Sequence, residues 1–139
     1  MFRKKANKPQ NRIDSLIGAG TKIEGNIAFS GGLRVDGEIV GNVTAQSDQA
    51  STLVLSDRAR IEGEIRVSHL VVNGTINGPV FAGEFIELQS SSRVKGDLHY
   101  STLEMHLGAI VEGKLVHRTG DSKDSKTVEL KLAASKPAG

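Results

Sequence analysis

Residues 17–43 read IGAGTKIEGNIAFSGGLRVDGEIVGNV, and this stretch carries the pattern that decides the fold. A five-residue phrase (Ile or Val, any residue, Gly, any residue, aliphatic) occurs in it three times, at Gly25, Gly37 and Gly41. The apolar residues recur with a period of two, which is the spacing of β-strands and not of helices. The glycines occupy the same alternation and are therefore expected to point inward. A glycine at such a position marks a tight bend or a close approach of two backbones, so we expect the chain to turn a corner at each one.

The same phrase returns along the whole central part of the chain. Its eight glycines are the predicted corner residues: Gly25, Gly37, Gly41, Gly63, Gly74, Gly78, Gly96 and Gly113. Repeats of this kind stack on their neighbours. If six of the glycines mark one turn each, from Gly25 to Gly113, five turns span 88 residues. The sequence therefore predicts an all-β, single-domain parallel β-helix over residues 15–117, with about six coils of roughly 17–18 residues.

One enzyme class has a coil of similar length. The left-handed β-helix of hexapeptide-repeat acyltransferases also has about 18 residues per coil, but it requires aliphatic residues spaced by six. Only two of the seven steps between the eight glycines are multiples of six. An acyltransferase of this type is kept as the alternative enzyme hypothesis, and a monomeric β-helical adaptor is kept as a third.

Few residues in the chain suit catalysis or cofactor binding. The sequence has no cysteine and four histidines, of which His99 and His117 are expected on opposite faces of a strand. Residues 18–22, GAGTK, lack the spacing of a phosphate-binding loop. We therefore expect no catalytic residue, no metal site and no cofactor, and the leading hypothesis is a structural protein that is not an enzyme.

The charges are divided unevenly along the chain. Residues 1–12 hold five of the 18 basic residues and no acid, whereas residues 13–117 hold eight bases and 13 acids. An acidic body is a poor surface for phosphates, so no nucleic-acid partner is expected. Residues 1–14 and 118–139 are expected to be disordered tails. No apolar stretch resembles a membrane span or a secretory signal, so the chain is expected to be cytoplasmic.

The first tail combines a short apolar hook with a basic run. Such a pair of weak signals is typical of peripheral attachment to an anionic membrane. The predicted membrane-targeting residues are Met1, Phe2, Arg3, Lys4, Lys5 and Lys8.

The block at residues 17–43, with its IEGNI and LRVDGEI phrases, resembles the bactofilins, which are bacterial cytoskeletal proteins. The resemblance covers about residues 13–117. It implies a right-handed β-helix that polymerises without nucleotide, head to head and tail to tail, into non-polar filaments. It also implies that the filaments associate peripherally with the inner membrane and recruit cell-wall synthesis or hydrolysis proteins that shape the cell. In the family, the N-terminal peptide that begins with Met-Phe and basic residues is the membrane-targeting motif.

Physical reasoning also predicts assembly through the ends of the solenoid. Each end of a β-helix exposes unpaired backbone groups and a layer of aliphatic side chains. No polar cap is evident at either end of the repeat, and uncapped repeats associate. The candidate polymerisation residues are Leu16, Ile17, Ile23 and Ile27 in the first coil and Tyr100, Met105, Leu107, Ile110, Leu115 and Val116 near the last.

Overall fold

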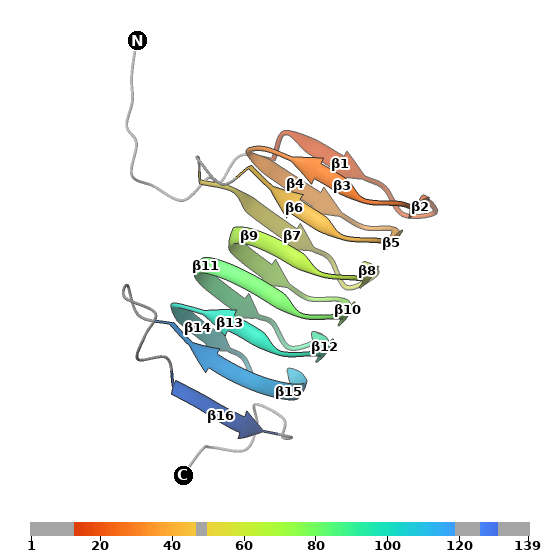
Figure 1. Ribbon diagram of the computed structural model, residues 1–139. Coiled ribbons are helices and arrows are strands. Elements are labelled where there is room, and N and C mark those ends of the chain that lie inside the picture. The colour runs from red at the N-terminus through yellow and green to blue at the C-terminus, as the bar shows by residue number, and fades with distance from the viewer. Residues whose placement is uncertain (1–12, 47–49, 119–125, 131–139) are drawn as a thin grey trace.

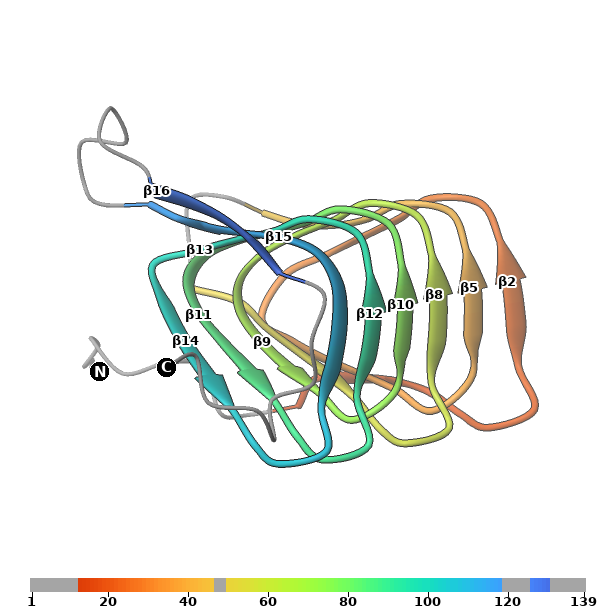
Figure 2. The same ribbon diagram turned by 90° about the horizontal axis from the view of Figure 1, so that it is seen from below.

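The fold is a solenoid made of β-strands. The computed structural model describes residues 13–46, 50–118 and 126–130, the last of these as backbone only. These residues contain sixteen strands and no helix. The first fifteen strands wind into six stacked coils (Figure 1), and the view from below shows the coils lying one behind another (Figure 2). The predicted all-β parallel β-helix of about six coils is confirmed.

The strands form three faces, and each face has one strand or strand segment per coil. Face 1 contains β1 (Ser15–Ile17), β4 (Gly32–Val35), β7 (Thr52–Leu55), the second parts of β9 (Ile65–Val72) and β11 (Val80–Leu88), and β14 (Thr102–Met105). Face 2 contains β2 (Lys22–Glu24), β5 (Glu38–Val40), β8 (Arg60–Glu62), β10 (Thr75–Asn77), β12 (Arg93–Lys95) and the first part of β15 (Ile110–His117). Face 3 contains β3 (Ile27–Phe29), β6 (Val43–Ala45), the first parts of β9 and β11, β13 (Leu98–Tyr100) and the second part of β15.

The core is a set of aliphatic ladders inside the three faces. On face 2 the inward ladder is Ile23, Ile39, Ile61, Ile76, Val94 and Val111. Its middle members Ile39, Ile61 and Ile76 have no exposed surface. Burying one such side chain contributes about 1.5–3 kcal/mol. The period-two pattern in the sequence is therefore the alternation between this core and the solvent.

Six of the predicted corner glycines stack at the corner between faces 2 and 3. They have φ values from +142° at Gly25 to +157° at Gly113, which side chains rarely adopt. A Cβ on Gly41, Gly63 or any later member would overlap the carbonyl of the glycine one coil earlier. The missing side chain would thus point along the stack and not into the core, so the inward orientation expected from the sequence is wrong. We call these six residues (Gly25, Gly41, Gly63, Gly78, Gly96 and Gly113) the glycine ladder.

The two remaining corner glycines lie at the corner between faces 1 and 2. A Cβ on Gly37 would overlap a carbonyl oxygen of the preceding coil, that of Thr21. A Cβ on Gly74 would overlap in the same way with Ser56. This second corner is also closed by backbone-to-backbone contact.

The coils differ in length. Successive members of the glycine ladder are separated by 16, 22, 15, 18 and 17 residues. The longest interval includes the segment between β6 and β7, which is an insertion between the second and third coils. The expected 17–18 residues therefore describe the mean coil, and the corners absorb the variation.

The C-terminal segment contains a strand that differs from the expected disorder. β16 (Lys126–Leu130) pairs antiparallel with β15, with Val128 opposite Leu115. The last coil has a free strand edge there, and a segment with alternating apolar residues can form backbone hydrogen bonds with it. The other tail residues 1–12, 119–125 and 131–139 lie outside the described residues.

We predict that Gly78→Ala destabilises the solenoid by about 2–6 kcal/mol, because strained backbone and steric overlap each cost about 1–3 kcal/mol. Gly83→Ala is the matched control, since a Cβ there meets no atom within 4 Å. Urea unfolding followed by circular dichroism measures both. Equal stability of the two variants would show that the glycine ladder does not set the spacing of the coils.

Candidate assembly interfaces at the ends of the solenoid

The first coil leaves its core layer partly uncovered. Ile23 and Ile27 point inward but are only half-buried, whereas Ile39 and Val43, their partners in the second coil, have no exposed surface. The side chains of the second coil cover them on one side only. Phe29 belongs to the same half-buried layer. This end of the rod is therefore an apolar layer without a second partner among the described residues.

The backbone at this end is open as well. Within the described part of the chain, β1 pairs only with β4, β2 only with β5 and β3 only with β6. Each of the three strands therefore has one free edge. Free strand edges next to exposed aliphatic side chains favour pairing with another chain.

The last coil is less exposed than the first. Val111 and Leu115 are 2% and 7% exposed, while Leu103 and Met105 pack against the core from half-buried positions. The second part of β15 has β16 beside it, whereas β14 pairs only with β11 within the described residues. The two ends of the solenoid are therefore unlike.

The structure brings some of the predicted interface residues together and separates others. Ile17, Ile23 and Ile27 form one layer at the first end. Leu16 is 61% exposed, but it shares the outward row of Arg34 and so lies on the flank of face 1. Leu107 is 70% exposed in the turn between β14 and β15.

The other predicted residues lie around the last two coils. Ile110 and Val116 are half-buried on outward rows of β15, and Leu115 is on its buried row. Tyr100 belongs to the fifth coil, and its ring centroid lies 5.7 Å from that of His117 in the sixth coil. Sequence reasoning missed Phe29 and Leu103, which the period-two pattern could have identified. The membrane-targeting residues predicted in residues 1–8 lie outside the described residues.

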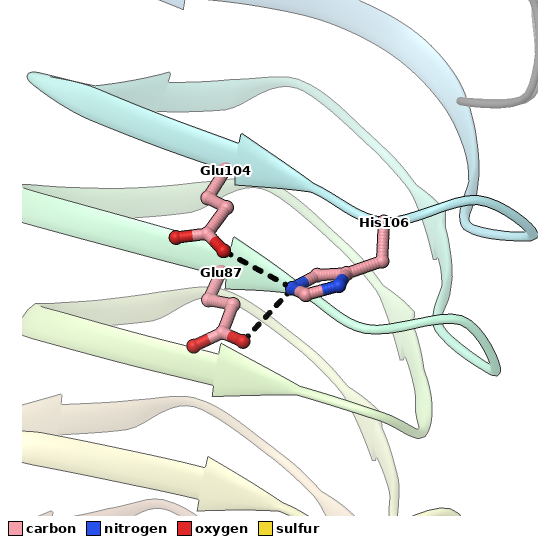
Figure 3. A group of neighbouring side chains, drawn as sticks. All are labelled: Glu87, Glu104 and His106. Atoms are coloured by element: carbon pink, nitrogen blue, oxygen red, sulfur yellow. Dashed lines mark hydrogen bonds and ion pairs between the residues drawn. The ribbon is translucent and has the colours of Figure 1, made fainter.

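Three potential metal ligands meet on face 1 between the last two coils (Figure 3). His106 Nε2 lies 3.0 Å from Oε2 of Glu87 and 3.3 Å from Oε2 of Glu104. Their ligand atoms lie within 4.8 Å of one another and include the nitrogen and oxygen donors that Zn²⁺ accepts. In the structure the imidazole Nε2 approaches two carboxylates that stack one coil apart, and a protonated ring there would reduce their repulsion. Sequence reasoning compared His99 with His117 and missed this group, although the 17-residue spacing of the two glutamates signals it.

A second group of side chains stacks on the outer side of face 3. The rings of Phe81 and His99 are parallel to within 13°, with centroids 4.3 Å apart, and the Arg66 guanidinium lies 4.1 Å from the centre of the Phe81 ring. These residues come from three successive coils, so the stack ties the coils together from outside. The pKa of His99 is lowered, chiefly because burial disfavours the charged ring, and nearby Arg118 adds to the effect.

A β-solenoid with free strand edges and a half-covered core layer belongs to the class of repeat proteins whose uncapped ends favour association. Comparisons with known proteins agree with this class. The family model described as "Bactofilin: Polymer-forming cytoskeletal" matches residues 15–116. The chain therefore belongs to the bactofilin family, which this description gives as polymer-forming and cytoskeletal.

Two relatives come from Myxococcus xanthus (strain DK1622). Bactofilin BacP is 23% identical over 112 residues, which cover 81% of this chain and 45% of BacP. Bactofilin BacO is 22% identical over 102 residues, which cover 73% of this chain and 78% of BacO. The chain thus spans less than half the length of BacP and most of the length of BacO. No solved structure was found to match it. Among the described residues, no helix is long and apolar enough to cross a membrane.

We predict that the free energy of unfolding falls as the pH drops below about 6.5, the ordinary pKa of histidine. Because the pKa of His99 is lower in the folded state, the unfolded chain binds the proton more tightly. The contribution of His99 is thus complete above pH 6.5 and decreases on acidification. Denaturant unfolding between pH 5 and 8 measures it. His99→Gln should flatten this part of the profile. An unchanged profile in His99→Gln would contradict the assignment.

Proposed function

We propose that this protein assembles end to end, without nucleotide, into non-polar filaments. The filaments lie on the inner face of the cytoplasmic membrane and recruit proteins of cell-wall synthesis or hydrolysis that shape the cell. The observation that carries the proposal is the half-covered first coil, where Ile17, Ile23, Ile27 and Phe29 stand beside three free strand edges. The membership of the chain in a polymer-forming family supports it.

Joining two first coils satisfies both exposed features at once. Apolar surface removed from water contributes about 25 cal/mol per Å², and the free edges gain backbone hydrogen bonds. A contact between two identical ends has two-fold symmetry, so it closes on itself. Growth into a filament then requires the last coils to join as well, which gives alternating head-to-head and tail-to-tail contacts and no overall polarity.

Nothing in this assembly requires nucleotide. The segment Gly18 to Lys22, compared above with a phosphate loop, runs from the end of β1 into the first residue of β2, so a strand and not a helix follows the loop. A phosphate loop depends on the N-terminus of such a helix. Burial of apolar surface supplies the driving force instead.

The structural role is favoured over the two alternatives. Membership in a cytoskeletal family favours a scaffold over a hexapeptide-type acyltransferase. A monomeric adaptor would be expected to cover its ends, whereas the inward residues of the first coil remain half-buried. The excess of acids over bases in residues 13–117 gives no reason to propose a nucleic-acid partner.

Membrane attachment is proposed from the sequence of the N-terminal segment. One apolar residue, Phe2, with a few bases gives weak attachment on its own, since stable anchoring takes stronger combined signals. A filament presents many copies of the segment in a row, and linked weak sites bind far more tightly than one. Polymerisation and membrane binding are therefore coupled in this proposal.

We predict that Ile27→Asp abolishes assembly in nucleotide-free buffer, because the charge would be buried unpaired in the joint between first coils. Ala28→Asp is the matched control, since Ala28 is the neighbouring exposed residue of β3. High-speed sedimentation measures assembly, and circular dichroism checks that both variants retain β structure. Wild-type protein and the control should pellet.

Two results would overturn the end-to-end mechanism. If Ile27→Asp pelleted as fully as Ala28→Asp, the first coil would not be a joint. If the wild-type protein pelleted only with ATP or GTP, the driving force would not be burial alone.

We predict that deleting residues 1–8, or changing Phe2 to Glu, releases filaments from anionic vesicles without disassembling them. The deletion removes the apolar hook and the basic residues Arg3, Lys4, Lys5 and Lys8. Raising the salt from 0.05 to 0.5 M should weaken binding of the intact filament, because salt screens these charges. Vesicle flotation measures binding and sedimentation measures assembly. Flotation of the truncated filament would place the membrane contact on the solenoid itself.

A further inference from the structure

The one antiparallel pairing among the described strands is at the last coil. β16 lies along the second part of β15, with Val128 opposite Leu115, Thr127 opposite Val116 and Lys126 opposite His117. Every other strand pair in residues 13–46 and 50–118 is parallel. In Figure 1, β16 continues the stack one step beyond β15. It therefore occupies the place where a seventh coil would add its strand on face 3.

The orientation of β16 matches that of a strand from a second copy. When two copies join tail to tail, a two-fold axis perpendicular to the rod relates them. Such an axis reverses the direction in which the chain circles the rod. Wherever strands of the two last coils stack, they must run antiparallel. β16 makes the contact that a symmetric partner would make at this edge.

β16 and a partner's strand also require the same backbone groups. Each residue of β15 has one N–H and one C=O, and in a strand these point alternately to the two neighbours. β13 occupies one side of the second part of β15, and β16 occupies the other. A second copy cannot pair with face 3 of the last coil until β16 leaves.

Burial of the last coil is consistent with its being closed. Leu115 is 7% exposed, whereas Ile27, which holds the same face-3 position in the first coil, is half-buried. The described residues place no strand beside the first coil comparable to β16. One end of the rod is thus open, and the other carries a strand that belongs to the same chain.

We propose that β16 is an autoinhibitory cap that imitates the strand of a second copy and must detach before tail-to-tail joining. The inference rests on the proposed end-to-end assembly and adds its regulation. With β16 in place, only the first coils are free to join, and growth stops at a dimer. With β16 detached, both ends join and the dimers become filaments. Whatever binds residues 126–130 would then lower the protein concentration at which filaments form.

A reversible disulfide tests this directly, because the chain has no cysteine. In the double variant Val116→Cys/Thr127→Cys the two positions are opposite each other on β15 and β16. Oxidation at low protein concentration should give a bond within one chain, seen as a monomer on a non-reducing gel. The oxidised protein should remain dimeric in analytical ultracentrifugation, and dithiothreitol should convert it to filaments. The single variants Val116→Cys and Thr127→Cys are the controls and should behave alike with and without dithiothreitol.

Removal of the cap is the complementary test. A chain that ends at Arg118 lacks β16 and should assemble at a lower concentration than the full chain. We expect a decrease of roughly tenfold in critical concentration, which corresponds to about 1.4 kcal/mol of strand pairing. Thr127→Pro and Val128→Pro provide milder versions. Neighbouring N–H groups of a strand point in opposite directions, so the N–H of one of these two residues faces β15, and proline at that position removes it.

The outcomes separate this inference from the proposed function. If the oxidised double variant formed filaments as fully as the reduced protein, or if truncation left the critical concentration unchanged, β16 would not be a cap, while end-to-end assembly would stand. If no bond formed between positions 116 and 127, the pairing itself would be refuted. If the reduced, the truncated and the wild-type proteins all remained monomeric, the proposed function would fail, and the inference would fail with it.

Discussion

The close approach of backbones at the glycine ladder is the constraint on which this structure depends. Each carbonyl of the ladder lies where the Cβ of the next glycine would be, so the coils reach strand-pairing distance only because no side chain is present. All three faces inherit their register from this corner, since β2 leads into β3 through Gly25 and β12 leads into β13 through Gly96. The aliphatic ladders then meet residue by residue. The insertion between the second and third coils changes the length of the chain but not the stacking, because Gly63 after it again lies in the glycine ladder.

The same regularity leaves the end coils of the solenoid exposed. Each interior coil packs against the coil before it and the coil after it, so the first and last coils each lack one neighbour in the repeat. Ile23 is therefore half-buried because a coil covers it on one side only, whereas Ile39 is completely buried between two coils. In the proposed assembly this consequence is used for polymerisation, and the core would continue from one chain into the next.

Much of this fold could be predicted from the sequence because its decisive interactions are repeated. The spacing of two between Ile23, Gly25 and Ile27 signals strands, and its recurrence signals stacking. The direction of the missing side chains was not predictable in the same way, since alternation suggests an inward position and only the positive φ shows that it is axial. Leu16 shows a related limit. Leu16 and Ile17 are adjacent aliphatic residues, and the sequence does not show which of them points inward; in the structure it is Ile17. Pairing between distant segments is harder still.

The features that sequence reasoning missed depend on single alignments between coils. Glu87 and Glu104 meet because β11 and β14 stack in one particular register, and His106 reaches both from beyond the end of β14. The stack of Phe81 on His99 requires intervals of different length to bring the two into one row. β16 is more difficult, since its five residues carry only a short alternation, and the free edge of β15 decides whether they form a strand. In each case the coil-to-coil register must be known first.

The half-covered first coil also has a consequence for motion. In a solenoid each coil contacts only its neighbours, so stability is distributed along one dimension and is lowest where a coil has one neighbour. The amide protons of β1, β2 and β3 should therefore exchange with solvent before those of β8 and β10, as a zipper opens from its free end. Contact with a second copy would turn this first coil into an interior one. In the proposed filament, the segment that frays most readily in the single molecule would become as rigid as the middle of the solenoid.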